Sequence, residues 1–256
     1  MIKEEAKISC SDILEGMSSI SALIKSMEAQ RTDRRIIRIL VDQGRVKHKQ
    51  AELRFLNAKS RALDFKIEIT DGEAIREKTV GTTHGGIIAE CTARTLPALM
   101  PQHIKDQGVY FILEGVEDPY NFGYAIRSLY AAGVDGVILD ERNWMGVAGV
   151  VARSSAGASE LMEMYVSKPT DAIEMMKSKG YRVICAGIRD SESLFETDLK
   201  KPLLVILGGE KRGISRSVLD LADQVVRIDY GTEFGGSLST AAATAVFAFE
   251  ILRYNR

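Results

Sequence analysis

Three loops between residues 118 and 239 of this 256-residue chain combine glycines with side chains that could do chemistry. The first, DPYNFGYAIR, holds Asn121 and Arg127 six residues apart. The second, GGEKRG, holds Glu210 directly after two glycines, and the third, GTEFGGSLS, holds Ser237. An amide, a guanidinium, a carboxylate and a hydroxyl that face one cleft could together bind and orient a polar substrate.

The glycines limit the kind of ligand that these loops could hold. Gly208 and Gly209 follow an apolar run, where a missing side chain lets a ligand approach the backbone. The absence of a GxGxxG or GxxxxGK[ST] pattern disfavours a nucleotide phosphate. The Glu210 carboxylate fits an uncharged or cationic ligand better. Ordinary turn chemistry explains each loop taken singly, but their occurrence in order favours one shared site.

Alternating strand-like and helix-like segments position these loops. Apolar runs lie at residues 109–113, 136–139, 182–186, 203–207 and 224–228, with helix-compatible stretches between them at 125–132, 147–154, 170–178 and 216–222. This alternation predicts an α/β fold with a mostly parallel sheet that is covered on both faces. Ligands of such sheets bind beyond the carboxyl ends of the strands, where the loops fall.

The last segment, from Ser237 to Arg253, has the strongest helical pattern in the chain. Its apolar residues recur at steps of three and four, and Ser237 is the expected N-cap. Its many alanines favour close packing, either against the sheet of the same chain or against a second subunit. The unpaired N–H groups of its first turn could bind polar atoms of a ligand.

A break near residues 95–106, with two of the five prolines, separates a smaller N-terminal part from this sheet. Upstream of the break we expect a helix over 19–29, a strand over 36–41, a helix over 50–63 and a strand over 65–70. The sequence therefore predicts a small N-terminal α/β domain over 1–100 and a C-terminal domain over 105–256.

Basic residues concentrate in the N-terminal domain. Between Lys25 and Arg61, 11 Lys and Arg residues face 4 Asp and Glu residues, although the whole chain has a net charge of −1. Such a stripe is typical of a surface that binds a polyanion, and a solvated helix face is the alternative. The candidates for this contact are Arg31, Arg34, Arg35, Arg45, Lys47 and Lys49.

The composition, 45% hydrophobic and 27% charged, is that of a globular protein. No apolar run approaches the roughly 18 residues of a membrane span, and the N-terminal residues lack the apolar core of a secretory signal. Three distant cysteines and three scattered histidines predict neither a disulfide framework nor a bound metal. We therefore expect a cytoplasmic protein with partly buried thiols and no membrane contact.

The three loops, read with their flanking segments, are similar to the motifs of one enzyme family. DPYNFGYAIRSLYAAGVDGVIL, LGGEKRGISRSVLDLADQVVRI and GGSLSTAAATAVFAFE resemble, in order, those of the SpoU (TrmH-type) RNA ribose 2′-O-methyltransferases. SSAGASE at 154–160 resembles a further signature, and the likeness extends over 109–253. Residues 16–90, including THGGIIAE, resemble more loosely the substrate-binding domain that precedes it in many members.

The resemblance implies a knotted (SPOUT-type trefoil) C-terminal fold, S-adenosylmethionine as cofactor, and a homodimer formed through that domain. It also implies that the basic stripe holds the phosphates of an RNA substrate. By position, the catalytic residues are Asn121, Arg127, Glu210 and Ser237. The cofactor-binding residues are Leu207, Gly208, Gly209, Ile228, Leu238 and Ser239.

Two positions depart from the family pattern. Ser237-Leu238-Ser239 stands where the family usually has Ser-Leu-Asn, and Ile228-Asp229-Tyr230 stands where it commonly has Ile-Pro-Met. Ser239 lacks the amide of asparagine, and Asp229 is expected to bring a carboxylate close to the adenosine pocket. A catalytically degenerate RNA-binding protein on the same scaffold is therefore the alternative function. A Rossmann dehydrogenase is disfavoured because its glycine fingerprint is absent.

The resemblance also implies a mechanism. Methyl transfer brings a cationic sulfonium carbon in line with a ribose 2′-oxygen, so a dry pocket that holds them about 3 Å apart favours the reaction. A guanidinium is a poor base, so Arg127 is expected first to stabilise the developing alkoxide and to grip a flanking phosphate. Asn121 and Glu210 would hold Arg127 and the ribose in register, and Ser237 would add a hydroxyl. Ribosomal RNA is expected rather than transfer RNA, because a separate domain precedes the knot.

Overall fold

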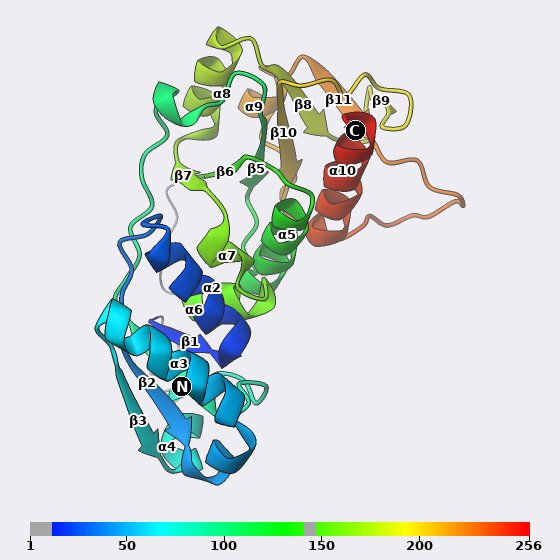
Figure 1. The fold of residues 1–256 in the computed structure, drawn as a ribbon. Coiled ribbons are helices and arrows are strands. Elements are labelled where there is room, and N and C mark those ends of the chain that lie inside the picture. The colour runs from blue at the N-terminus through cyan, green and yellow to red at the C-terminus, as the bar shows by residue number, and fades with distance from the viewer. Residues whose placement is uncertain (1–11, 141–146) are drawn as a thin grey trace. The chain divides into compact units, whose positions relative to one another are not determined.

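The computed structural model describes residues 12–140 and 147–256, and the chain forms two compact units (Figure 1). The first unit contains residues up to 95 together with 143–161, and the second contains 96–142 and 162–256. The break expected near 95–106 lies at the first boundary between the units. The sequence places 143–161 in the C-terminal domain, whereas the contacts of this segment group it with the first unit.

The second unit is built on a seven-stranded sheet in which every neighbouring pair is parallel. In spatial order its strands are β7 (Met164–Val166), β6 (Gly136–Leu139), β5 (Val109–Glu114), β10 (Leu203–Gly208), β8 (Arg182–Ala186), β11 (Gln224–Arg227) and β9 (Glu192–Ser193). The predicted α/β fold with a mostly parallel sheet is thereby confirmed. The sequence missed β7 and β9, which have only three and two residues.

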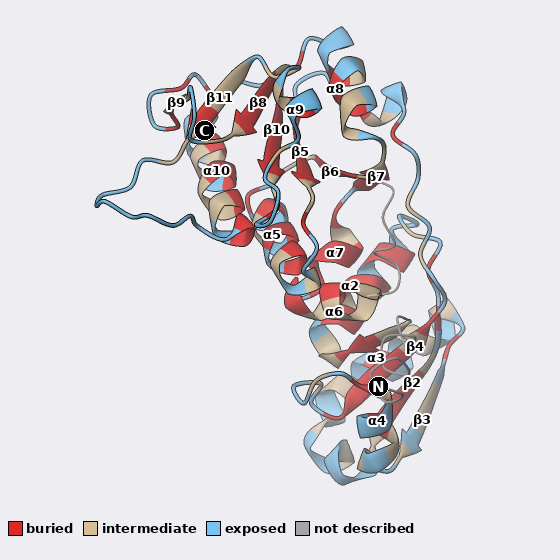
Figure 2. Cartoon of the chain, turned by 180° about the vertical axis from the view of Figure 1, so that it is seen from behind, coloured by how far each residue is buried: buried red, intermediate tan, exposed pale blue. Residues whose placement is uncertain are grey.

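Helices cover both faces of this sheet. Strands that are buried on both sides carry apolar residues without interruption, which is the pattern seen in the sequence. On one face, Tyr110 and Ile112 of β5 pack in a core with residues of α8 (Pro169–Ser178) and α9 (Arg216–Leu219). On the other, α5 (Pro119–Ala131) and α10 (Thr240–Tyr254) pack against each other, and α10 contacts β10. Figure 2 shows the central strands as buried.

The neighbouring strands β5 and β10 end together, with Gly208 opposite Glu114. They therefore deliver the loops that follow them to one edge of the sheet. The first loop ends at Asp118, whose side chain accepts a hydrogen bond from the Tyr120 N–H at 3.0 Å and caps α5. Pro119 occupies the first helical position, which needs no N–H donor.

The start of α10 differs from the sequence prediction. The helix begins at Thr240, and Ser239 is its N-cap, with its hydroxyl accepting a hydrogen bond from the Ala242 N–H at 3.2 Å. The expectation that Ser237 caps the helix is therefore wrong. Both serines are good N-cap residues by type, so residue preference could not choose between them.

The first unit contains a four-stranded sheet in the order β1 (Ile13–Glu15), β4 (Ile87–Cys91), β2 (Ile36–Asp42) and β3 (Lys66–Thr70), in which only β2 and β3 are parallel. Its helices are α2 (Gly16–Glu28), α3 (Gln50–Leu63), α4 (Gly72–Lys78) and the 3-10 helix η1 (Gln43–His48). Leu23, Ile39 and Leu56 lie in a common apolar core of this unit. The sequence missed β1, β4 and α4.

The segment SSAGASE (154–160) runs from the end of α6 (Ala148–Ser154) into α7 (Ala158–Leu161). Helix α6 packs on β1, and α7 packs on α2. Gly157 lies so close to α2 that a Cβ there would be 2.6 Å from the Ala22 methyl. Two ion pairs also hold the segment. Arg153 Nη1 lies 2.9 Å from Glu15 Oε2, and Arg34 Nη1 lies 3.3 Å from Glu160 Oε1.

The cysteines and the helix lengths can be compared with the expectations from the sequence. Cys91 and Cys185 are buried free thiols, and burial raises the pKa of each to about 12. Cys10 lies outside the described residues. No helix within 12–140 and 147–256 has both the length and the apolar character that a membrane crossing requires. A short 3-10 helix, η2 (Pro101–His103), lies near the start of the second unit.

The buried ion pair of Arg34 predicts a stability effect. The side chains of Arg34 and Glu160 are only 1% and 3% exposed. We expect Arg34→Ala to lower the free energy of unfolding by about 3–5 kcal/mol, because Glu160 would remain as a buried charge without its partner. Urea unfolding followed by circular dichroism measures this. The exposed Arg31→Ala is the matched control, with an expected change below about 0.5 kcal/mol; equal effects of the two substitutions would contradict the structural role.

Candidate active site

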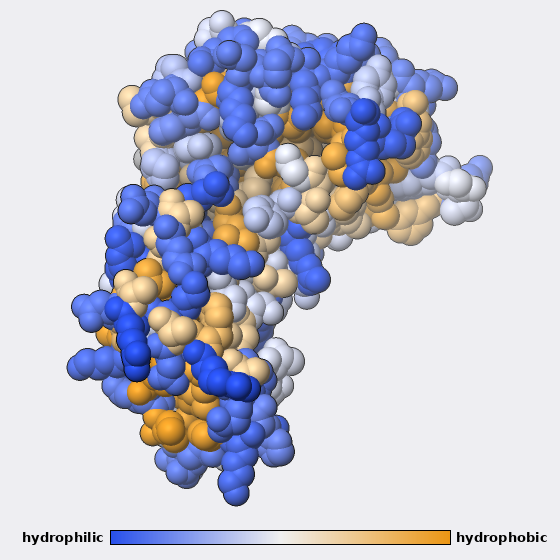
Figure 3. Space-filling model, in the orientation of Figure 1, coloured by the Kyte–Doolittle hydropathy of each residue, from blue (hydrophilic) through white to orange (hydrophobic). Residues whose placement is uncertain are grey.

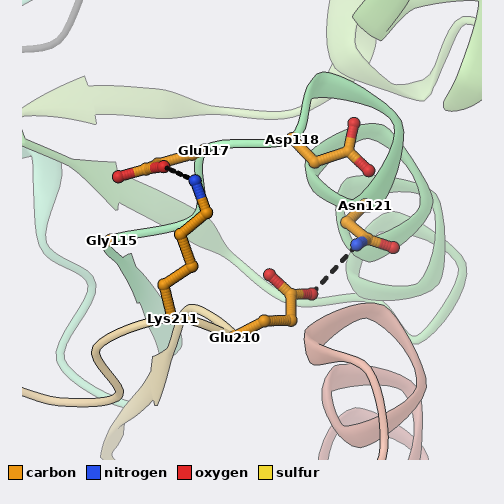
Figure 4. Close-up of a pocket in the computed structure, with 6 residues that line it drawn as sticks. All are labelled: Gly115, Glu117, Asp118, Asn121, Glu210 and Lys211. Atoms are coloured by element: carbon orange, nitrogen blue, oxygen red, sulfur yellow. Dashed lines mark hydrogen bonds and ion pairs between the residues drawn. The ribbon is translucent and has the colours of Figure 1, made fainter.

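Asn121 and Glu210 meet at the carboxyl edge of the sheet (Figure 4). The Asn121 side-chain amide donates a hydrogen bond to Glu210 Oε1 at 2.9 Å, and the backbone N–H of Thr240 donates to the same oxygen at 3.2 Å. One carboxylate thus ties the first turn of α5 to the first residue of α10. A negative charge at this place is also stabilised by the N-terminal end of α10.

The Asn121–Glu210 contact forms one side of a small cavity. The cavity has a volume of about 490 Å³, and Gly115, Asp118 and Lys211 contribute to its lining. Lys211 Nζ forms an ion pair with Glu117 Oε2 at 2.8 Å across it (Figure 4). Both charged side chains of that pair are largely exposed, so the pair contributes little to stability.

A larger cavity, of about 930 Å³, also has Glu210 in its lining and is large enough for a small-molecule ligand. Two residues with predicted catalytic roles, Glu210 and Ser237, contribute to its lining. The residues with a predicted cofactor role that line it are Leu207, Gly208, Gly209, Ile228 and Leu238. The structure thus brings together segments that lie far apart in the sequence.

Two parts of this cavity were missed by the sequence reading. The loop 186–190, which follows β8, lines it, and so does Thr240. The Thr240 hydroxyl donates a hydrogen bond to the Gly208 carbonyl at 3.0 Å, which joins the start of α10 to the end of β10. The position of the loop after a parallel strand was the only signal for 186–190.

The two glycines after β10 serve the packing of the protein itself. A Cβ on Gly208 would lie 2.3 Å from the carbonyl carbon of Gly213, and a Cβ on Gly209 would lie 2.1 Å from the Gly115 oxygen. Such distances are far below van der Waals contact with backbone that cannot move aside. We expected these two positions to be glycine so that a ligand can approach the backbone. Close packing against the protein's own backbone is a second reason why a side chain cannot stand there. The two glycines let the loops after β5 and β10 touch.

Asp229 and Ser239, the two departures from the family pattern, lie outside the lining of the large cavity. The Asp229 carboxylate accepts hydrogen bonds from the Ser193 hydroxyl and, at 2.8 Å, from Arg227 Nε. These contacts, that of Ser193 first, lower the pKa of Asp229. The Asp229 side chain is thus held beside the cavity wall, between the lining residues Ile228 and Tyr230, without lining the cavity itself. Ser239 caps α10 instead of forming cavity wall, and serine and asparagine cap helices about equally well.

Arg127 is not brought to either cavity of its own chain. It is exposed in the second half of α5, and six residues separate it from Asn121. In an α-helix that spacing corresponds to about 9 Å along the axis and about 240° around it, so the two side chains point in different directions. The expectation that Asn121 holds Arg127 within one chain is not met. Arg127 shares an exposed stripe with Tyr120 and Tyr124.

The basic candidates of the N-terminal domain divide into different environments. Arg34 is buried and ion-paired, so its predicted contact with RNA is wrong. Arg31 and Arg35 are exposed. Arg45 and Lys47 are exposed on η1, and Lys49 follows them with an ion pair to Glu52 at 2.7 Å. We call Arg45, Lys47 and Lys49 the η1 cluster. The THGG turn lies beside it, because a Cβ on Gly86 would be 2.8 Å from Arg45 Cγ.

Comparison with known proteins matches both parts of the chain. The model of the SpoU rRNA methylase family matches residues 108–249, and that of the RNA 2′-O ribose methyltransferase substrate-binding domain matches residues 13–97. The chain belongs to the SpoU rRNA methylase family. A SpoU relative from Shewanella oneidensis, named 23S rRNA (guanosine-2′-O-)-methyltransferase RlmB, is 31% identical over 254 residues, which are 96% of this chain and 98% of the relative.

Solved SpoU structures share the fold. An AdoMet-bound rRNA methyltransferase from Sinorhizobium meliloti superposes with a TM-score of 0.76 at 21% identity, covering 94% of this chain and 87% of the other. The SpoU methyltransferase AviRb from Streptomyces viridochromogenes, in complex with AdoMet, gives a TM-score of 0.73 at 18% identity, covering 94% and 89%. At these identities the likeness establishes the fold alone.

As a SpoU methylase, the protein is an S-adenosylmethionine-dependent RNA ribose 2′-O-methyltransferase, and the predicted family, activity and cofactor are confirmed. The donor set of the large cavity fits this cofactor. Leu207, Ile228 and Phe247 give apolar walls for an adenosyl group, and Glu210 gives a negative charge for a sulfonium. The alternative function, a catalytically degenerate RNA-binding protein, rested on Asp229 and Ser239. It is disfavoured because neither residue lines the cavity.

Proposed function

We propose that this SpoU methyltransferase methylates the ribose 2′-hydroxyl of a guanosine in 23S rRNA, as a cytoplasmic homodimer with a knotted C-terminal fold. The observation that carries the substrate is the match to a 23S rRNA guanosine methyltransferase along almost the whole of both chains, substrate-binding domain included. The three transferase motifs would be expected in tRNA enzymes as well, so the N-terminal domain favours rRNA.

The η1 cluster is the proposed RNA-binding surface of the first unit. Its Arg45 and Lys47 side chains are exposed and follow one another on a single turn, beside the THGG turn. Cations in that arrangement bind phosphates without reading the base sequence. The cluster would supply affinity, and the cavity of the second unit would select the nucleotide that reacts.

The large cavity is proposed to hold the cofactor, which supplies an electrophilic methyl group. Leu207, Ile228 and Leu238 would exclude water from it, and a dry site strengthens every charge interaction inside. Glu210, held by Asn121 and the Thr240 N–H, presents a fixed carboxylate on the cavity wall. Its charge would orient the cation and polarise nearby hydroxyl groups, and Ser237 would hold the ribose by a hydrogen bond.

The exposed position of Arg127 supports a site that two subunits complete. Tyr120, Tyr124 and Tyr130 on α5 and Phe249 on α10 are exposed large side chains on two helices that pack together. Figure 3 shows hydrophobic residues gathered over α10. Exposed aromatic side chains of this density favour a protein–protein contact. We infer that two copies pair through this α5–α10 face, so that Arg127 of the partner subunit stabilises the developing alkoxide.

The substrate is tested by mapping 2′-O-methyl groups in total RNA from cells with and without the gene. We expect the loss of one guanosine 2′-O-methyl group in 23S rRNA, and its return when the wild-type gene is supplied. Loss of a methyl group from tRNA alone would contradict the rRNA assignment, and an unchanged map would contradict both.

The shared site predicts complementation between two inactive variants. Arg127→Ala and Glu210→Ala should each abolish methyl transfer, while Arg127→Ala keeps its affinity for S-adenosylmethionine in calorimetry. After the two proteins are mixed and allowed to exchange subunits, half of the dimers are mixed and each mixed dimer has one intact site. Activity should then return to about a quarter of the wild-type value. A mixture that stays inactive while subunits exchange would place Arg127 and Glu210 in the same chain's site.

Neutral substitution of the η1 cluster predicts a change in salt dependence. Arg45→Gln combined with Lys47→Gln should weaken binding to 23S rRNA and lower the slope of log K against log[salt] by about 1.5–2. Filter binding at several salt concentrations measures the slope. Lys66→Gln is the matched control, because Lys66 is exposed at the opposite end of β3 from η1. Equal slopes for both variants would contradict a specific role of the η1 cluster.

A further inference from the structure

An aromatic pair stands at the entrance of the large cavity, apart from the residues assigned to methyl transfer. Tyr230 lines the cavity and is 38% exposed, and Phe234, which does not line it, is 56% exposed. Their ring centroids lie 5.8 Å apart, with the planes tilted by 57°. They belong to the segment between β11 and α10, whose residues 231–239 are all exposed and project from the second unit (Figures 1 and 2).

Contacts within the segment hold the two rings in place. The Tyr230 hydroxyl accepts a hydrogen bond from the Leu238 N–H at 3.2 Å, which closes the base of the segment. The backbone passes close to the Phe234 ring, since a Cβ on Gly236 would lie 2.7 Å from its Cζ. Asp229, directly before Tyr230, is fixed by Ser193 and Arg227. Aromatic rings that are both exposed and positioned are suited to stacking on a flat ligand.

The charge around the entrance indicates what kind of ligand that is. Arg189 and Arg212 line the same cavity and are exposed, and neither forms an ion pair with a residue of the described chain. Arg216, by contrast, is paired with Asp220 at 2.8 Å. Guanidinium groups without a carboxylate partner bind phosphates in a bidentate manner. Rings beside such cations are the usual combination in proteins that hold single-stranded nucleic acid.

We propose that Tyr230 and Phe234 form a stacking site for an unpaired base of the RNA substrate, with Arg189 and Arg212 holding phosphates next to it. This inference rests on the proposed function, because a ribose that reacts at the cavity carries its base to the entrance. RNA is recognised mainly through unstacked bases in loops and bulges. The adenine of the cofactor is a less suitable partner, because Phe234 lies beyond the cavity wall.

The test uses the full-length enzyme and total RNA from cells that lack the gene, which contains both rRNA and tRNA. Phe234→Leu keeps an apolar side chain but removes the ring. We expect the KM for RNA to rise by about ten- to a hundredfold, the range that one base–aromatic stack contributes, with kcat at saturation unchanged. Phe234→Tyr should restore the KM. Phe195→Leu is the control, since Phe195 is 55% exposed but does not line the cavity, and it should match the wild type.

Three outcomes of this test would overturn the stacking site. An unchanged KM in Phe234→Leu means that no base stacks there. A loss of affinity for S-adenosylmethionine in calorimetry assigns the ring to the cofactor, and a monomer in light scattering assigns it to the contact between subunits. Methylation of tRNA alone by the wild type would contradict the proposed substrate. The effect of Phe234→Leu on the KM would then be measured with tRNA, so the stacking site would still be tested. A wild type that methylates no RNA would overturn both proposals.

Discussion

The contact between the loops after β5 and β10 is the constraint on which the rest of the active site depends. Gly208 and Gly209 allow backbone to meet backbone, and any side chain there would collide with Gly213 or Gly115. The contact sets Glu210 beside Asn121 and under the first N–H of α10, so one carboxylate joins the first turn of α5 to the start of α10. The packing of α5 on α10, and with it the wall of the large cavity, follows from that placement.

Sequence periodicity predicted the parallel sheet because strands buried on both faces are apolar without interruption, and this property needs no tertiary knowledge. It could not predict details that depend on which of two equal candidates the tertiary structure selects. Ser239 caps α10 where Ser237 would have served equally well by type. Asp229 lies between the lining residues Ile228 and Tyr230, yet its carboxylate is held by Ser193 and Arg227 and does not line the cavity. The very short strands β1, β7 and β9 carry too few residues for a pattern.

The sequence could not predict which basic side chains are available to bind RNA, because composition counts cations without showing which carboxylates pair with them. Within one basic stripe, Arg34 is buried against Glu160, Arg38 is bound by Glu68 and Glu90, and Lys49 is paired with Glu52. Arg45 and Lys47 remain exposed on η1. A polyanion therefore meets fewer unpaired cations than the count of 11 basic residues suggests. The three-dimensional pairing of charges decides which cations are available to RNA.

The buried pair of Arg34 also gives the SSAGASE signature a structural meaning. The chain leaves the sheet of the second unit after β6, folds as α6 and α7 against the first unit, and returns as β7. Arg34 and Glu15 of the first unit each take an ionic partner, Glu160 and Arg153, from this excursion. Ion pairs as deeply buried as Arg34–Glu160 contribute little net stability compared with apolar packing, but they strongly penalise a wrong partner. We infer that this pair specifies where α6 and α7 pack within the first unit, on the sequence that precedes residue 95.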